Sequence, residues 1–207
     1  MDLIRPFQTV TPTLDGDVLA VLARAPDVPF TPGQVQRVLG RHSEEGIRKV
    51  LRRLTAHGTV RSTRIGNAYT YRLAEEHLAY PHVLGLARLF DEFLERLEAA
   101  LGKWAIRPVY GAVFGSAARG TMTVHSDIDL LLVRPDDAAE DIWDRQVSDL
   151  LTAVNGWTGN DVRDLQFTAA QIKQSGRDEP VLTDVLREGL TVAGSRREFT
   201  RLLRGRG

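Results

Sequence analysis

Two aspartates and a glycine–serine pair carry the chemistry that this sequence can perform. Gly115 and Ser116 end an apolar run, and after ten intervening residues Asp127 and Asp129 open a second one. Side chains alternate across a strand, so the two aspartates leave the same face. Carboxylates this close repel each other unless something positive lies between them, and a hard divalent cation is the usual partner.

The glycine–serine pair suits a phosphate group. Glycine lets the backbone approach closely, and the hydroxyl of Ser116 and nearby N–H groups can bond phosphate oxygens. A short helix opening here would direct its positive end at the same anion. Arg119 either adds a charged donor or lies in solvent. A phosphate cradle beside an acidic pair predicts metal-assisted phosphoryl or nucleotidyl transfer.

This pattern resembles the nucleotidyltransferases of the DNA polymerase beta superfamily, and it looks closest to the minimal members. The resemblance covers roughly residues 104–195 and rests on Gly115, Ser116, Asp127 and Asp129 at this spacing. It implies that two Mg²⁺ ions are bridged by the aspartates and that a nucleoside triphosphate is held by Gly115, Ser116 and Arg119. In-line attack by an acceptor hydroxyl on the α-phosphate would then release pyrophosphate.

The superfamily adds a third carboxylate on the next strand, which we expect at residues 162–167. Asp164 and Asp161 are the candidates, and their opposite parity prevents both from pointing at the first pair. We favour Asp164 as the third catalytic residue and metal ligand because it lies inside the strand. Asp161, at the mouth of the strand, is the alternative.

Composition places the chain among ordinary globular proteins. Of its 207 residues, 43% are hydrophobic and 26% are charged. The sequence has no cysteine, which excludes disulfides and thiolate metal sites. It shows neither a signal peptide nor an apolar stretch of about 20 residues, so we expect a cytoplasmic protein with no membrane partner.

Charge is divided unevenly along the chain. Residues 1–73 hold 11 Lys and Arg against six Asp and Glu, whereas the full chain is neutral. This basic region predicts three helices and a hairpin, an order that resembles the winged helix-turn-helix of bacterial transcription regulators. The resemblance implies DNA binding through the third helix and the hairpin tip. The candidate DNA-binding residues are Arg48, Lys49, Arg52, Arg53 and Arg64.

We therefore predict an α+β protein with four segments. A winged helix-turn-helix domain (1–74) precedes a linker helix (75–104), a minimal nucleotidyltransferase domain with a small mixed β-sheet flanked by helices (105–195), and a basic helical tail (196–207) that we expect to be solvated. The apolar stripe of the linker fits either packing on the sheet or pairing in a homodimer. Of the two, we favour the dimer.

The expected function is Mg-dependent transfer of a nucleoside monophosphate to an acceptor hydroxyl on a protein, an RNA or a small molecule. A DNA-binding module fused to a minimal transferase favours a toxin–antitoxin or autoregulatory role, with a toxin protein or an RNA as acceptor. The alternative is a non-catalytic transcription regulator whose transferase-like domain senses a nucleotide.

Overall fold

The chain forms two compact units in the computed structural model, which describes residues 1–205 except for the side chains at 175 and 177. One unit comprises residues 5–90, and the other comprises residues 1–4 with the chain from Asp91 onward. The division falls inside a helix, later than the boundary expected after residue 74.

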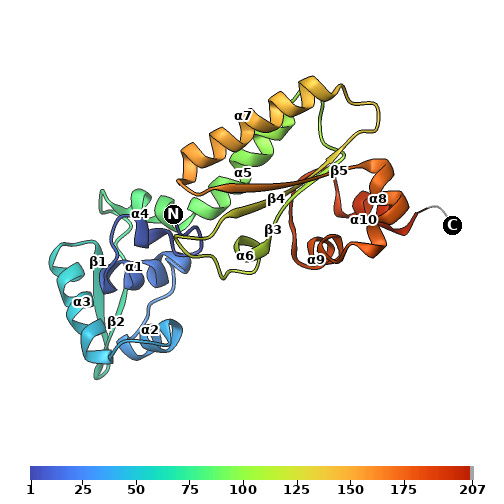
Figure 1. The fold of residues 1–207 in the computed structure, drawn as a ribbon. Coiled ribbons are helices and arrows are strands. Elements are labelled where there is room, and N and C mark those ends of the chain that lie inside the picture. Colours follow the sequence, from blue (N-terminus) through green and yellow to red (C-terminus); the bar gives the residue numbers. More distant parts are fainter. Residues whose placement is uncertain (206–207) are drawn as a thin grey trace. The chain divides into compact units, whose positions relative to one another are not determined.

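The N-terminal unit consists mainly of short helices, and two of them begin with a side-chain cap. The hydroxyl of Thr31 accepts the N–H of Gln34 in a capping box, and that of Ser43 accepts the N–H of Gly46. The elements are η1 (Pro6–Thr9), α1 (Leu14–Arg24), α2 (Pro32–Leu39), α3 (Glu44–Ala56), β1 (Val60–Ile65), β2 (Ala68–Leu73) and α4 (Tyr80–Ala87) (Figure 1).

The hairpin of this unit is antiparallel and turns at Gly66, whose φ is +59°. Phe30, between α1 and α2, forms a bridge with Tyr71 through two backbone hydrogen bonds of 2.8 Å. The hairpin is therefore tied to the helices. The helices bury one apolar face each, and their shared core includes Val18, Leu22, Val35, Ile47 and Leu51.

The C-terminal unit is built on a four-stranded sheet in the order β5-β4-β3-β6. The strands are β3 (Tyr110–Phe114), β4 (Ile128–Arg134), β5 (Val162–Thr168) and β6 (Leu190–Ala193). β4 runs parallel to β5 and antiparallel to β3, and β6 is antiparallel to β3. The predicted small mixed sheet and the α+β class are confirmed.

Helices cover both faces of this sheet (Figure 1). α5 (Leu89–Gly102) and α7 (Glu140–Thr158) lie along one face, where the buried Trp143 donates a hydrogen bond to Gln166 of β5. The other face carries α6 (Gly115–Ala118), α8 (Ala169–Ser175), η2 (Gly176–Asp178), α9 (Pro180–Glu188) and α10 (Arg196–Arg204). β3 and β4, at the centre of the sheet, are mostly buried between these two layers of helices, whereas β5 at the edge stays partly exposed.

Two expectations about helices are wrong. The predicted linker helix is two helices, α4 and α5, separated at Arg88. The predicted tail is helical over α10, and its last two residues lie outside the described residues, but it is not solvated: Phe199 is fully buried and stacks on Tyr110 of β3 with ring centroids 4.2 Å apart. Phe199 and Leu203 are four residues apart, so both lie on one helix face and complete the core.

Candidate active site

The glycine–serine turn and the aspartate pair meet where β3 ends and β4 begins. Phe114, the last residue of β3, pairs with Asp129, and Gly115 follows with a φ of +67°. A β carbon on Gly115 would lie 2.0 Å from Oδ2 of Asp129. Only glycine therefore allows both the turn and this approach of the carboxylate. The structure brings together the two halves of the sequence motif.

The turn continues into a single helical turn, as the sequence predicts. α6 begins at Gly115, and Arg119 ends it with a backbone hydrogen bond of 3.1 Å to the Gly115 carbonyl. The guanidinium of Arg119 pairs with the carboxylate of Glu188 at 2.6 Å, and the Glu188 side chain is only 18% exposed. This ion pair holds the half-exposed Arg119 side chain beside the site, and sequence reasoning did not identify Glu188 as its partner.

The segment that leads into β4 is anchored by hydrogen bonds. Ser126 Oγ accepts the N–H of Thr123 at 3.0 Å, and the Ser126 carbonyl accepts Nδ2 of Asn160 at 2.9 Å. Asn160 is almost fully buried. It was not predicted as a site residue, and its only signal is its place directly after Gly159, which ends α7. Asn160 fixes the backbone that places Asp127.

Asp127 has a partner that the sequence analysis did not predict. Nε of Arg163 lies 2.6 Å from Oδ2 of Asp127, with side-chain exposures of 76% and 27%. Arg163 is the residue of β5 that pairs with Asp129, so it shares the face of both aspartates. The sequence did contain a signal for this: Arg163 lies two residues after Asp161, so both side chains leave the same face of an extended strand.

The electrostatics at Asp129 suit a cation. Burial raises the pKa of the Asp129 carboxyl above its usual range, and the neighbouring Asp127 raises this pKa further, whereas Arg163 and Arg119 lower it. The net direction is upward, so the two arginines do not fully offset the cost of ionising Asp129. Two oxygen-donor carboxylates on one face, incompletely neutralised, fit a divalent cation such as Mg²⁺.

The favoured third carboxylate lies on the other face of the sheet. Asp164 pairs with Leu130, and its Oδ2 accepts Nε2 of Gln166 at 2.6 Å in the chain of hydrogen bonds that reaches Trp143 on α7. The preference for Asp164 is therefore corrected, because the register of β4 and β5 places Arg163, and not Asp164, on the sheet face that carries Asp127 and Asp129. Asp161 is exposed at the mouth of β5, and its carbonyl accepts the N–H of Ile128. Over residues 1–205, no three acidic or histidine side chains converge into a metal cluster.

The predicted DNA-binding residues do not all face the same way. Arg53 makes three hydrogen bonds of 2.6 to 3.0 Å with the carboxylate of Asp15, so it ties α3 to α1. The other four are exposed on α3 or at the hairpin, where Arg48 and Arg52 pair with glutamates at the start of α3. These four are Arg48, Lys49, Arg52 and Arg64.

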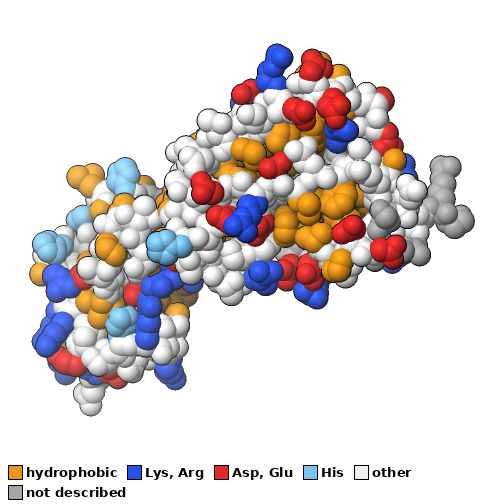
Figure 2. All heavy atoms as spheres, viewed as in Figure 1, with side chains coloured by type: hydrophobic (Ala, Val, Ile, Leu, Met, Phe, Trp, Pro, Cys, Tyr) orange, Lys and Arg blue, Asp and Glu red, His pale blue; other side chains and the backbone are white. Residues whose placement is uncertain are grey.

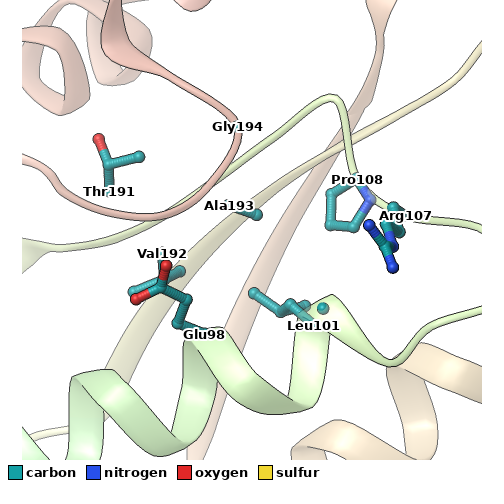
Figure 3. A pocket seen from close by; sticks show the side chains of 9 residues that line it. Glu98, Leu101, Arg107, Pro108, Thr191, Val192, Ala193 and Gly194 are labelled. Atoms are coloured by element: carbon teal, nitrogen blue, oxygen red, sulfur yellow. The ribbon is translucent and has the colours of Figure 1, made fainter.

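A separate hollow of about 260 Å³ lies at the other end of β3 (Figure 3). It is lined by α5 and by the end of β6, with Glu98 and Arg107 as its charged residues. In the register of β3 and β6, Ala193 pairs with Gly111, whereas the glycine–serine turn follows Phe114. The hollow is therefore distinct from the carboxylate pair.

Among the described residues, no helix is both long and apolar enough to cross a bilayer.

A comparison with protein families supports the assignment of this region. Residues 94–194 match the family model described as a nucleotidyltransferase domain. Among solved structures, a toxin–antitoxin with AMP-PNP is similar at 16% identity and a mutant of the toxin–antitoxin MntA-HpeT at 14%. Each covers 53% of this chain and 80% of its own, with a TM-score of 0.40. A search of curated proteins found no match.

Proposed function

We propose that the nucleotidyltransferase domain formed by residues 94–194 transfers a nucleoside monophosphate from a nucleoside triphosphate to an acceptor hydroxyl. The acceptor oxygen forms a bond to the α-phosphorus, the bond from the α-phosphorus to the bridging oxygen breaks, and pyrophosphate leaves. The hydroxyl proton passes to solvent. The observation that carries the proposal is the close approach of Gly115 to the Asp129 carboxylate, which puts the glycine–serine turn against the acidic pair.

Each residue of the site has a role in this reaction. Asp127 and Asp129 would hold Mg²⁺, which when bound offsets the charge of the triphosphate. The backbone of Gly115 and the hydroxyl of Ser116 bind phosphate oxygens. Arg119, fixed by Glu188, adds positive charge beside the pair. The two carboxylates supply ligands for one ion, and the second ion implied by the superfamily resemblance would need a further ligand on β5.

Three matched substitutions test this assignment. Asp127→Asn and Asp129→Asn remove one charge each from the proposed site, and Asp164→Asn makes the same change on the opposite face of the sheet. We expect transfer of label from α-³²P nucleoside triphosphates to fall by a factor of about 100 or more in the first two variants and to stay near wild type in the third. Equal transfer by all four proteins would rule out the site.

DNA binding by the N-terminal unit is also part of the proposal. The order of helices and hairpin, with the bridge between Phe30 and Tyr71, supports a winged helix-turn-helix. A groove of about 480 Å³ runs between α3 and the hairpin, lined by Arg48, Arg52 and Tyr69 among others. Lys and Arg side chains lie over the α3 region in the view of Figure 2. Phosphate contacts from this face would supply affinity.

A gel-shift experiment with the operon's own promoter DNA tests this part. Lys49→Ala combined with Arg52→Ala removes two exposed charges of α3, whereas Arg24→Ala, at the end of α1, removes one charge elsewhere in the same unit. We expect the double variant to bind DNA more weakly. We also expect the slope of log affinity against log salt concentration to decrease by the amount that about two phosphate contacts contribute. Unchanged binding by the double variant argues against the winged-helix interface.

The combined architecture supports a toxin–antitoxin or autoregulatory role in the cytoplasm, with a homodimer reading paired DNA sites. The acceptor is then a toxin protein or an RNA. Labelling a cell extract with α-³²P nucleoside triphosphates, followed by separate digestion with protease and ribonuclease, distinguishes these acceptors. Label that survives both digestions in small molecules contradicts both.

One observation favours a second candidate, a regulator that senses a nucleotide without turnover. Arg163 pairs with Asp127 where the superfamily resemblance implies a third carboxylate. Both candidates bind a nucleotide, so binding does not separate them. Multiple turnovers with released pyrophosphate support the enzyme, and stoichiometric binding without pyrophosphate supports the sensor.

A further inference from the structure

We propose that Arg163 binds the triphosphate of the incoming nucleotide, and that the site therefore holds one divalent cation per nucleotide instead of two. This inference rests on the proposed function of the same site. It concerns the one feature in which the site departs from the superfamily pattern: a cationic side chain on β5 at the place where a carboxylate is expected.

The register of the sheet fixes the position of Arg163. It pairs with Asp129 across β4 and β5, and the pleat sends both side chains to the face that also carries Asp127. Its Nε lies 2.6 Å from Oδ2 of Asp127. Arg163 thus lies beside both carboxylates that would bind a cation, on the side away from β3.

No other side chain supplies a third carboxylate at this place. Asp164 is held on the opposite face by Gln166. Asp161 has the same parity as Arg163 but is exposed at the mouth of β5, and in the described part of the chain it does not join Asp127 and Asp129 in a cluster of three ligands. Two carboxylates are enough for one Mg²⁺, which keeps several waters and completes its shell with phosphate oxygens. A guanidinium charge at the third position repels a second cation.

The ion pair of Arg163 is suited to exchange of partners. The Arg163 side chain is 76% exposed, and ion pairs this open to water contribute little. A bound cation would compete with Arg163 for Asp127 and would free the guanidinium. Phosphate oxygens match the planar donor fork of arginine and carry more negative charge than one carboxylate. Arg119, the other arginine that acts on Asp129, is already held by Glu188.

Metal counting and nucleotide affinity test the proposal without relying on turnover. The probes are Mn²⁺, observed by electron paramagnetic resonance, together with α,β-methylene ATP or inorganic tripolyphosphate. We expect the wild-type chain to bind one Mn²⁺ in the presence of either saturating probe. We expect Arg163→Gln to lower the affinity for α,β-methylene ATP and for tripolyphosphate by about 10- to 100-fold. Arg163→Lys should restore part of this affinity.

Two further variants make the test specific. Arg163→Asp supplies the missing carboxylate, and we expect it to bind two Mn²⁺ with α,β-methylene ATP. Arg134→Gln is the matched control, because Arg134 also pairs with a carboxylate, Glu140, but lies at the other end of β4. We expect this control to bind both probes as the wild type does, and circular dichroism checks that each variant is folded.

The outcomes separate this proposal from the proposed function. Two Mn²⁺ ions in the wild type, or unchanged probe affinity in Arg163→Gln, overturn the role of Arg163 and leave the transferase assignment standing. A wild-type chain that binds neither probe overturns both. One Mn²⁺ in the wild type, together with lower affinity of Arg163→Gln for α,β-methylene ATP and tripolyphosphate, supports Arg163 as a phosphate-binding residue.

Discussion

Gly115→Ala is the substitution whose consequence the structure defines most closely. Gly115 has a φ of +67°, a conformation that costs a residue with a β carbon about 1–2 kcal/mol. The new β carbon would also lie 2.0 Å from Oδ2 and 2.9 Å from Cγ of Asp129. Forcing the half-buried Asp129 side chain aside costs about 1–3 kcal/mol more. We therefore expect a total loss of about 2–5 kcal/mol in the free energy of unfolding.

Gly120 is a matched control for this substitution. Its φ is +70°, and a β carbon there would meet no atom within 4 Å. Gly120→Ala should therefore show the backbone cost alone, about 1–2 kcal/mol. The assay is urea denaturation followed by tryptophan fluorescence. All three tryptophans, Trp104, Trp143 and Trp157, lie in the C-terminal unit, so the signal reports that unit.

A double-mutant cycle separates the two costs at Gly115. Asp129→Ala removes the two atoms of the closest contact and leaves only Cβ, at 3.3 Å from the new β carbon. In that background, Gly115→Ala should cost close to what Gly120→Ala costs. The coupling energy between Gly115 and Asp129 should be about 1–3 kcal/mol. Equal losses at the two glycines, or additive effects in the cycle, would refute the close contact between the turn and the carboxylate.

Three other substitutions test the packing and electrostatics. Phe199→Ala removes a fully buried ring, so calorimetry should show a loss of about 3–5 kcal/mol, and a near-neutral result would contradict the docking of α10. Burial raises the pKa of the Asp129 carboxyl in the folded state. The protonated carboxyl therefore stabilises the folded state at low pH, and this stabilisation is lost as pH rises through the folded-state pKa. In EDTA, the stability of Asp129→Asn relative to wild type should therefore increase from pH 4 to pH 7; a constant difference would contradict this. Arg53→Ala breaks the contact with Asp15 and should lower the melting temperature more than Lys49→Ala does, which a thermal scan can check.

How much of this site can be predicted from the sequence depends on how far apart in the chain the interacting residues lie. The turn at Gly115 and the shared face of Asp127 and Asp129 follow from local rules, because a glycine breaks a strand and side chains alternate along it. The assignment of Asp164 depended on how β5 aligns with β4, which no local pattern specifies. A shift of one residue exchanges Asp164 for Arg163 on the active face.

The same reasoning explains the errors in the helices. The run from residue 80 to 102 keeps helical spacing throughout, so periodicity alone predicts one helix, whereas the structure has a break at Arg88. Four of the nine residues of α10 are arginines, which favoured a solvated helix over one that buries Phe199 and Leu203. Burial of these two side chains is a tertiary effect, visible only once β3 and α8 provide the surface they cover.

Parallel labelling with α-³²P and γ-³²P nucleoside triphosphates tests the central claim most directly. In a cell extract supplemented with the wild-type protein, we expect the α-label to become attached to an acceptor and the γ-label to appear as pyrophosphate. Asp129→Asn should abolish both signals. Attachment of the γ-label to the acceptor, or α-label transfer that is equal in Asp129→Asn, would contradict nucleotidyl transfer at the aspartate pair.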